Sequence, residues 1–380
     1  MAPFAFGVTA TKIHSTRSFS LPNTCTYSTC GTSSNPVSLL FFKNLAIDSA
    51  PNLFCNSLCS QKALPQKIFQ PQRILAMAVN VEKAAPRYAV VTGANKGIGF
   101  ETVKQLANSG VTVILTARNE KRGMEATSLL NKQGFSNVVF HQLDVQDAQS
   151  IESLAKFIQT QYGRLDILVN NAGASGVVVD EDTLKALNID PVDWLAGKAA
   201  NVVQVAMKTT YESAKLCLDT NYYGVKNVTE ALLPLLQNSP SARIVNVSSL
   251  RSELKRVPNE ERRKELRDIE NLTEDKIDKI LQNFLHDLKQ DALEVNGWQI
   301  MLPAYSISKV SLNAYTRILA TRYPKICINC VHPGYVNTDI NWHTGTMPVE
   351  EGAEGPVMLA LLPDGGPTGC YFDRTVVAEF

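Results

Sequence analysis

The chain has 380 residues, of which 44% are hydrophobic and 19% charged, with 37 basic and 36 acidic side chains and a formal net charge of +1. This length is sufficient for one large domain or two ordinary ones. Acids slightly outnumber bases beyond residue 80, so the composition excludes a strongly cationic protein that binds nucleic acid or anionic membranes.

Residues 1–80 differ in composition from the rest, because they hold one acid, Asp48, against six bases and are rich in Ser, Thr, Asn, Pro and Phe. A leader of this kind with few arginines is typical of an organelle transit peptide, plastid more than mitochondrial. Its apolar run at 39–42 is too short for a secretory or membrane segment. We therefore expect a chloroplast leader. The alternative is a disordered extension, with Met77 as the start of a shorter cytoplasmic form.

From Tyr88 onward, short apolar runs alternate with helical patterns. Strands are expected at 89–91, 111–115, 138–140, 165–169, 243–247 and 326–331, and helices at 100–106 and 151–158. This alternation predicts an α/β protein with a doubly wound parallel sheet, a Rossmann fold, in a single domain over residues 85–380. Ligands of such sheets bind at the carboxyl ends of the strands.

The first strand leads into a glycine-rich turn with Gly93, Gly97 and Gly99. Glycines let the backbone approach a pyrophosphate, and the start of the following helix supplies free N–H donors; a plain turn is the alternative. Arg118, and no carboxylate, follows the second strand, and Lys96 lies in the glycine turn. These two cations favour NADP(H) over NAD(H), unless Arg118 is only a solvated residue at the start of a helix.

The segment from 251 to about 297 interrupts the alternation before the last predicted strand. It is dense in charge, yet its apolar residues fall on one helical face: Ile277, Ile280, Leu281, Phe284, Leu285 and Leu288. The pattern predicts an inserted amphipathic helix that packs on the domain surface. A second interpretation is that this helix also shields an edge and so controls oligomerisation, and both can hold together.

Tyr305 and Lys309 lie one helical turn apart, so their side chains project from the same face. A phenol titrates near ~10 in water, and a neighbouring cation favours the phenolate. We therefore expect Lys309 to lower the pKa of Tyr305 toward the working range. A tuned proton donor downstream of a nucleotide-binding turn predicts hydride-transfer chemistry.

The remaining cysteines and histidines predict no metal site. The four cysteines beyond the leader show no disulfide framework. Cys327 and Cys330 lie three apart on a predicted strand, where they would face opposite sides as two buried thiols. His141 ends a predicted strand and His332 precedes a proline, so structural roles are expected for both.

With these residues in view, the chain resembles the short-chain dehydrogenase/reductase family over residues 85–380. The resemblance rests on motifs in the family order: TGANKGIG at 92–99, LDV at 143–145, NNAG at 170–173, Asn221, VSS at 247–249, YSISK at 305–309, PG at 333–334 and VNT at 336–338. The glycine turn with its lysine, the insertion before the tyrosine and the ending GCYFD at 369–373 are similar to the plant group of salutaridine reductases and neomenthol dehydrogenases. Animal carbonyl reductases are similar in outline.

The resemblance implies a role for each matched residue. Tyr305 would donate a proton to a carbonyl oxygen, and Lys309 would bind the nicotinamide ribose and lower the tyrosine pKa. Ser249, with Ser248 as the fallback, would hydrogen-bond the substrate oxygen. Asn221 would hold a water that links Lys309 to solvent. The residues implied to contact NADP(H) are Gly93, Asn95, Lys96, Gly97, Ile98, Gly99, Arg118, Asp144, Val145, Asn171, Ala172, Gly173, Tyr305, Lys309, Pro333, Gly334, Val336 and Thr338.

We therefore expect an NADPH-dependent oxidoreductase that reduces a ketone or aldehyde on a small hydrophobic metabolite, a terpenoid, alkaloid or aromatic carbonyl, and runs reversibly as an alcohol dehydrogenase. Alternatives are an enone double-bond reductase, whose tyrosine tends to be altered, and an NADP-binding sensor, which often loses the tyrosine or lysine. Apolar residues at 174–205 and 335–350 predict a hydrophobic substrate pocket. The resemblance implies that the segment near Trp342 and His343 lies over the substrate. The inserted helix would obstruct the usual dimer face, which predicts a monomer.

Overall fold

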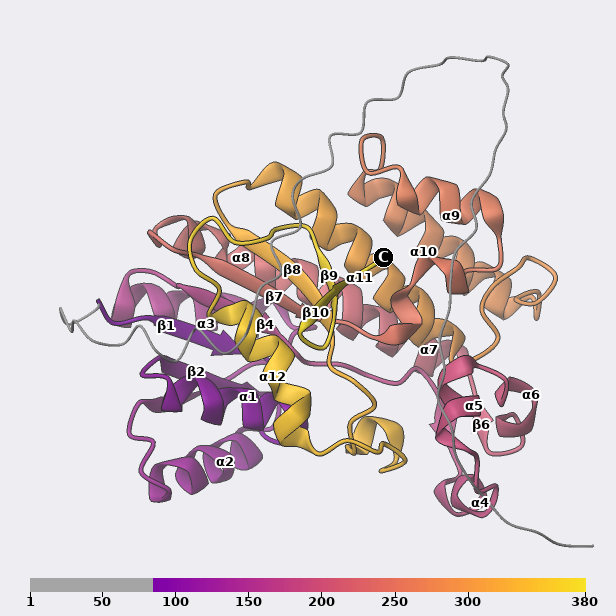
Figure 1. The fold of residues 1–380 in the computed structure, drawn as a ribbon, viewed down its shortest axis with the longest axis horizontal. Helices are drawn as coiled ribbons and strands as arrows, with labels where there is room; N and C mark the ends of the chain where they lie inside the picture. Colours follow the sequence, from indigo (N-terminus) through magenta and orange to yellow (C-terminus); the bar gives the residue numbers. More distant parts are fainter. Residues whose placement is uncertain (1–84) are drawn as a thin grey trace, which may run out of the picture. The chain divides into compact units, whose positions relative to one another are not determined.

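Eight short strands form one central sheet in the computed structural model, which describes residues 85–380 (Figure 1). The leader predicted for residues 1–80 lies outside the described residues. The sheet consists of β1 (Tyr88–Val91), β2 (Thr112–Ala117), β3 (Val138–Gln142), β4 (Ile167–Asn170), β7 (Arg243–Val247), β8 (Cys327–His332), β9 (Tyr371–Asp373) and β10 (Val376–Ala378).

The strand order is β10-β9-β8-β7-β4-β1-β2-β3, and every neighbouring pair is parallel except β9 and β10. The predicted doubly wound parallel sheet is therefore confirmed, as are all six predicted strands. β9 and β10 were not predicted. Because the chain winds outward in opposite directions from the pair β1 and β4, the carboxyl ends of these two strands open a crevice for a ligand.

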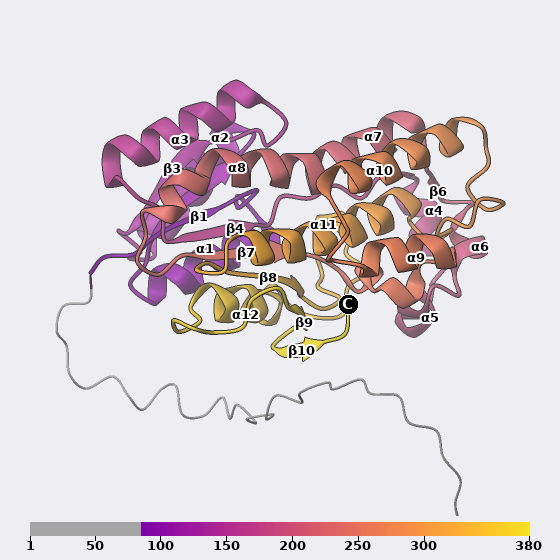
Figure 2. The ribbon, with the colours of Figure 1, turned by 90° about the horizontal axis from the view of Figure 1, so that it is seen from above.

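Helices cover both faces of the sheet, because successive strand residues point to opposite sides. Val90, Leu168 and Ile244 face a core that also contains α3 (Ala148–Tyr162), α8 (Gly224–Gln237) and α11 (Pro303–Arg322). Their neighbours in the strands face a second core with α1 (Gly97–Asn108), α2 (Glu120–Lys132) and α12 (Val349–Ala360). Figure 2 shows α8 and α11 on one side of β7 and β8, and α12 on the other.

The insertion folds as two short 3-10 turns, η3 (Leu250–Ser252) and η4 (Leu254–Arg256), followed by α9 (Glu260–Arg267) and α10 (Glu274–Lys289). The predicted amphipathic helix is confirmed as α10. Its apolar face packs against α11 and α7 (Tyr211–Leu218). Trp298 closes the insertion: its ring lies 5.2 Å from that of Phe284, and its indole nitrogen donates to Asp287 at 2.8 Å.

A small lobe, residues 178–208, projects beside the sheet with an apolar core of its own. Two antiparallel strands, β5 (Val178–Val179) and β6 (Met207–Lys208), close its base. Between them lie α4 (Glu181–Ala186), α5 (Pro191–Ala196) and α6 (Ala200–Val203). Asp180 and Asp190 begin α4 and α5 by accepting hydrogen bonds from backbone N–H groups two or three residues ahead. None of the helices between residues 85 and 380 is long and apolar enough to cross a bilayer.

Candidate active site

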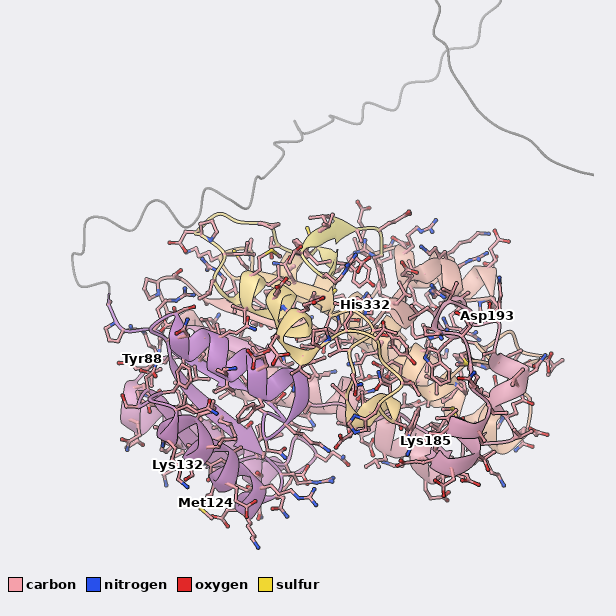
Figure 3. All side chains as sticks on the ribbon, turned by 60° about the horizontal axis from the view of Figure 1, so that its bottom comes forward. Tyr88, Met124, Lys132, Lys185, Asp193 and His332 are labelled. Carbon is pink, nitrogen blue, oxygen red and sulfur yellow. The ribbon has the colours of Figure 1, made fainter. Side chains whose placement is uncertain are left out.

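A cavity of about 770 Å³ lies at the carboxyl ends of the sheet strands, where β1, β4 and β7 end. Every residue that the resemblance assigns to the cofactor lines this cavity. Figure 3 shows the small lobe, marked by Lys185 and Asp193, beside the sheet, with His332 between them. The cavity extends from the ends of the sheet strands to Trp194 and Leu195 of the small lobe, which also line it.

The glycine turn after β1 is a narrow backbone cradle. Gly93 and Gly97 have φ of 62° and 59°, a region that glycine adopts without strain. A Cβ on Gly99 would lie 2.3 Å from the amide nitrogen of Asn171, which itself donates to the carbonyls of Thr92 and Gly93. Because α1 begins at Gly97, its free N–H groups open onto the same space. This cradle fits the pyrophosphate of a dinucleotide.

The two cations predicted to favour NADP(H) differ in their surroundings. Arg118, after β2, is exposed and lines the cavity with Asn119 and Arg122. Lys96 instead forms an ion pair with Asp339, whose other carboxylate oxygen lies 3.0 Å from His343 Nε2. The Lys96 ammonium lowers the pKa of Asp339. Sequence reasoning did not find this partner, which links the glycine turn to the far wall of the cleft.

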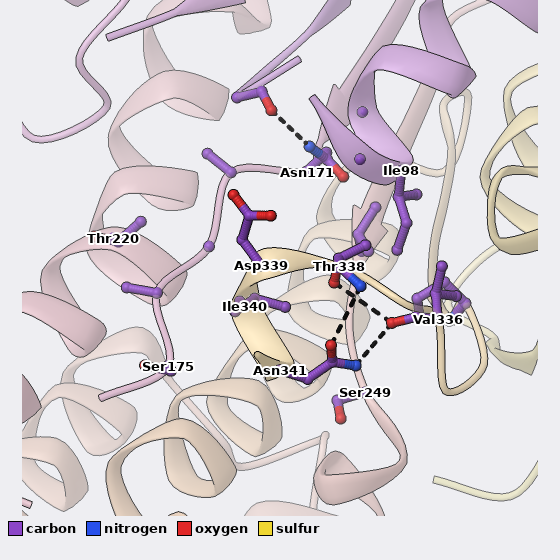
Figure 4. A pocket seen from close by; sticks show the side chains of 18 of the residues that line it. Ile98, Asn171, Ser175, Thr220, Ser249, Val336, Thr338, Asp339, Ile340 and Asn341 are labelled. Atoms are coloured by element: carbon purple, nitrogen blue, oxygen red, sulfur yellow. Dashed lines mark hydrogen bonds between the residues drawn. The ribbon is translucent and has the colours of Figure 1, made fainter. Parts of the chain in front are cut away.

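Residues 333–343 form that far wall, as a loop held by its own side chains. Figure 4 shows Asn341 between Val336 and Thr338: its amide nitrogen donates to the Val336 carbonyl at 2.7 Å, and its oxygen accepts from the Thr338 N–H at 3.2 Å. The Tyr335 hydroxyl and that of Thr344 are 2.5 Å apart. Val336 and Thr338, which are predicted to contact the cofactor, thus lie in a loop that these hydrogen bonds hold in place.

Ser249, Tyr305 and Lys309 meet at the inner end of the cavity, although they come from two different elements. Ser249 follows β7, while Tyr305 and Lys309 lie on the first turns of α11. The Lys309 ammonium donates to the carbonyl of Val247 at 2.7 Å and lies 5.7 Å from the centre of the Tyr305 ring. The hydroxyl of Ser248 is bound instead to Asn313 at 2.5 Å, which favours Ser249 as the serine that faces the tyrosine.

The expected direction of the Tyr305 pKa shift is wrong for this structure. Burial raises the pKa of Tyr305 to about 12, opposed by a hydrogen bond with Ser249 and by the charge of Arg251. Burial also lowers the pKa of Lys309 to about 8. Desolvation therefore outweighs the charge of Arg251 at Tyr305. At neutral pH the phenol keeps its proton, which suits a proton donor to a carbonyl oxygen.

Asn221 lies behind this cluster rather than in the cavity wall. It is fully buried in a π-helical turn between α7 and α8. Its amide oxygen accepts from the Ala174 N–H at 2.8 Å, and its nitrogen donates to the Ala174 carbonyl and to the Ser308 hydroxyl, each at 3.0 Å. Asn221 therefore braces the helix turn that carries Lys309, and its role toward a water stays a prediction.

The two histidines have different surroundings. His141 packs at 4.9 Å from the ring of Phe157 and contacts the carbonyl of Gln142, away from the cavity. His332 lines the cavity, and burial lowers its pKa to about 4, so it is neutral at physiological pH. Cys327 and Cys330 are both free and buried in β8, as predicted. The described residues contain no group of His, Cys, Asp and Glu side chains suited to a metal ion.

Aromatic residues and one buried arginine make the substrate end of the cavity. Trp194 on α5 stacks on Tyr335 with ring centres 6.5 Å apart and planes inclined by 22°. Leu195 lines the cavity beside them, as does Arg251. Sequence reasoning placed apolar residues here but did not find Trp194 or Arg251. Arg251 could have been predicted as a site residue, because it lies two residues after the predicted serine, in the loop that follows a strand end.

Comparison with known proteins agrees with this geometry. A family model described as short chain dehydrogenase matches residues 87–260. Short-chain dehydrogenase/reductase 1 of Saponaria officinalis is 53% identical over 300 residues, covering 78% of this chain and 97% of the relative. (+)-Neomenthol dehydrogenase of Arabidopsis thaliana is 49% identical over 299 residues, covering 78% and 98%. The solved structure of salutaridine reductase from Papaver somniferum matches with a TM-score of 0.71 and 49% identity, over 76% of this chain and 99% of that one.

Proposed function

The chain belongs to the short-chain dehydrogenase/reductase family, and we propose that it reduces a ketone or aldehyde group on a small hydrophobic metabolite to the alcohol with NADPH. The observation that carries this proposal is the meeting of Ser249, Tyr305 and Lys309 at the inner end of one cavity. The relatives reported above are named as a neomenthol dehydrogenase and a salutaridine reductase, which supports a terpenoid, alkaloid or aromatic carbonyl as substrate class. The same site runs in reverse as an alcohol dehydrogenase.

In this proposal Tyr305 and Ser249 act on the carbonyl oxygen, while Lys309 and Asn221 act on the cofactor and on the helix turn. Bound NADPH supplies the hydride for the carbonyl carbon. The Tyr305 hydroxyl, protonated at neutral pH, donates its proton to the oxygen. The Ser249 hydroxyl hydrogen-bonds the same oxygen where negative charge develops. Lys309 holds the nicotinamide ribose, and Asn221, through its bond to Ser308, keeps the Lys309 turn in place.

NADP(H) is favoured over NAD(H) because a cation, Arg118, and not a carboxylate directly follows β2. Arg118 and Arg122 both line the cavity there. A guanidinium matches the fork geometry of a 2′-phosphate, whereas an NAD-binding site commonly places an acid at this position. Asp144 and Val145 line the same cavity and are proposed to flank the adenine.

The position of the inserted helix α10 supports the proposal that the protein is a monomer. α10 covers α7 and α11, and its side chains are tied to the domain by ion pairs: Lys226 lies 2.8 Å from Glu274, which also pairs with Arg322 at 2.7 Å. This surface is therefore occupied within the chain. Light scattering coupled to size exclusion gives the mass directly, and the mass of a dimer would contradict the proposal.

For residues 1–80 we keep the proposal of a plastid transit peptide, which rests on composition alone. A fluorescent protein fused after residue 80 should enter chloroplasts of plant cells. A fusion that begins at Met77 should stay in the cytoplasm. Cytoplasmic fluorescence from both fusions would contradict a targeting role.

The test of the catalytic proposal is NADPH oxidation by the full chain against monoterpene, alkaloid, aromatic and short-chain ketones and enones, with product identification. Tyr305→Phe removes only the hydroxyl, so cofactor binding should persist while turnover falls by at least about 100-fold. Alcohol products that depend on Tyr305 support ketone reduction, and saturated ketones from enones would favour double-bond reduction. NADPH binding without turnover on any compound would favour a sensor.

A further inference from the structure

Arg251 is a buried cation at the substrate end of the cavity. Its side chain lies in the cavity wall, yet the residue is only 8% exposed. One guanidinium nitrogen donates to the backbone carbonyl of Trp194, where α5 ends. A Cβ added to Gly197 would meet another at 3.2 Å, so the guanidinium packs closely on the small lobe.

No carboxylate between residues 85 and 380 pairs with Arg251. The groups that act on its charge are Arg256, which opposes it, and the phenols of Tyr305 and Tyr335, which favour it. The neighbouring Arg256 does have a carboxylate partner, because Glu253 lies 2.9 Å from its guanidinium. Burial lowers the pKa of Arg251 to about 10, so it still carries its charge at neutral pH.

A buried guanidinium without an anion is unfavourable, because desolvation of the charge is not compensated by a partner. Arginine has five N–H donors in a fixed fork, and a single carbonyl leaves most of them available. Such a fork binds a carboxylate in bidentate fashion. The backbone N–H of Arg251 donates to the Ser249 hydroxyl at 3.2 Å, so this fork belongs to the same short segment as the carbonyl-binding serine.

We propose that Arg251 binds an anionic oxygen of the substrate, so that the substrate class is a ketone whose hydrophobic skeleton also carries a carboxylate or phenolate. This inference rests on the proposed function, since it assumes that the reducible carbonyl lies at Ser249 and Tyr305. The stacked Trp194 and Tyr335 give the skeleton between the two ends a flat aromatic wall. The aromatic wall by itself would bind charged and uncharged ketones equally, and Arg251 would favour the ketones that carry an anionic oxygen.

Arg251 has one competing role, as a tether of the small lobe. Arg256 offers a matched control for it, because its guanidinium donates to the carbonyl of Leu195 at 3.0 Å, the residue next to Trp194. Both arginines thus hold the end of α5, but Arg256 does not line the cavity. A tether alone predicts equal effects from the two arginines, whereas recognition predicts an effect of Arg251 only.

The experiment compares 3- and 4-acetylbenzoate with the matching 3- and 4-methylacetophenone, using the full-length protein with NADPH. The quantity measured is kcat/KM for each acid divided by kcat/KM for its methyl counterpart. For at least one isomer, Arg251→Met should lower this ratio by roughly 10- to 100-fold, which corresponds to the loss of a charged hydrogen bond. Arg256→Met should leave the ratio within about twofold of the wild type. Equal ratios in all three proteins would overturn the proposal.

Two further measurements keep the result interpretable. Arg251→Lys keeps the charge without the fork, so it should retain part of the preference if the Met variant does not fold. A lysine variant that loses turnover of acid and methyl ketones alike indicates a tether and overturns the proposal. If the wild type turns over none of the four ketones, calorimetry with the acetylbenzoates decides. Binding that weakens in Arg251→Met supports the site while the reductase proposal fails, and binding that is absent or unchanged overturns the site.

Discussion

Lys309 and Val247 are joined by a hydrogen bond of 2.7 Å from the lysine ammonium to the backbone carbonyl, across 62 residues of sequence. The bond connects the helix that carries Tyr305 to the strand end that precedes Ser249. A single buried cation therefore sets the spacing between two hydroxyls that are proposed to act on one substrate oxygen. Lys309 is only 4% exposed, and burial lowers its pKa from 10.5 to about 8.

The depressed Lys309 pKa predicts a characteristic dependence of stability on pH. Between pH 8 and 10.5 the unfolded chain holds a proton on Lys309 that the folded chain has released, so this group makes unfolding less favourable as pH rises. Relative to Lys309→Met, the free energy of unfolding of the wild type should rise by up to about 3 kcal/mol over that range. Urea unfolding at several pH values measures the difference, and parallel curves for the two proteins would contradict the assignment.

Arg118 should set the preference for NADPH. Arg118→Ala removes the guanidinium proposed to bind the 2′-phosphate, so the Kd for NADPH should rise by roughly 10- to 100-fold while that for NADH changes little. Titration of cofactor fluorescence measures both constants. Lys121→Ala is the matched control, because Lys121 is also exposed on the start of α2 but does not line the cavity. Equal losses of NADPH and NADH affinity would show that Arg118 does not bind the 2′-phosphate.

Asp339 should weaken NADPH binding in the wild type, because it neutralises Lys96 in the glycine turn. Asp339→Asn keeps the shape of the side chain and frees the ammonium for the phosphate. The pair is exposed, so the gain in NADPH affinity should be small, roughly two- to fivefold, and should shrink as salt is raised. NADH serves as the control and should show no gain. Weaker NADPH binding in this variant would mean that the ion pair stabilises the bound form.

Gly99 should accept even a methyl group only at a cost in stability, unlike Gly173. A Cβ at Gly99 would lie 2.3 Å from the Asn171 amide nitrogen and 3.0 Å from two backbone atoms, whereas one at Gly173 would meet nothing closer than 3.5 Å. Gly99→Ala should therefore cost about 1–3 kcal/mol of stability, lowering Tm by roughly 3–10 °C. Gly173→Ala should keep the Tm but weaken cofactor binding, because it fills cavity space. Equal Tm values for both variants would contradict the cradle geometry.

Local chemistry explains why the sheet and the cofactor cleft were predictable. Strands such as β4 and β7 are buried on both faces, so apolar residues predominate in them and mark them as strands without any knowledge of their neighbours. Gly93 and Gly97 need positive φ because of the turn itself. Residues at the ends of parallel strands then meet at one edge, because the topology allows little else.

Elements whose stability comes from distant partners were not predictable. β10 is three residues long with exposed Val376 and Val377, so no apolar alternation marks it, and only pairing with β9 defines it. The small lobe is held by a few large side chains, among them Trp194, whose partner Tyr335 lies far along the chain. Neither element carries a periodic signal of its own.

The sequence by itself determined the family and the doubly wound parallel sheet, because motifs and short-range periodicity are local properties. Only the tertiary structure decided the charge states and the partners inside the cavity. Burial contributed by the whole fold raises the Tyr305 pKa that a sequence neighbour was expected to lower. The fold also buries Arg251 with no carboxylate beside it in residues 85–380, and this burial lowers its pKa to about 10. Desolvation depends on every atom packed around a group, and that sum exists only once the chain has folded.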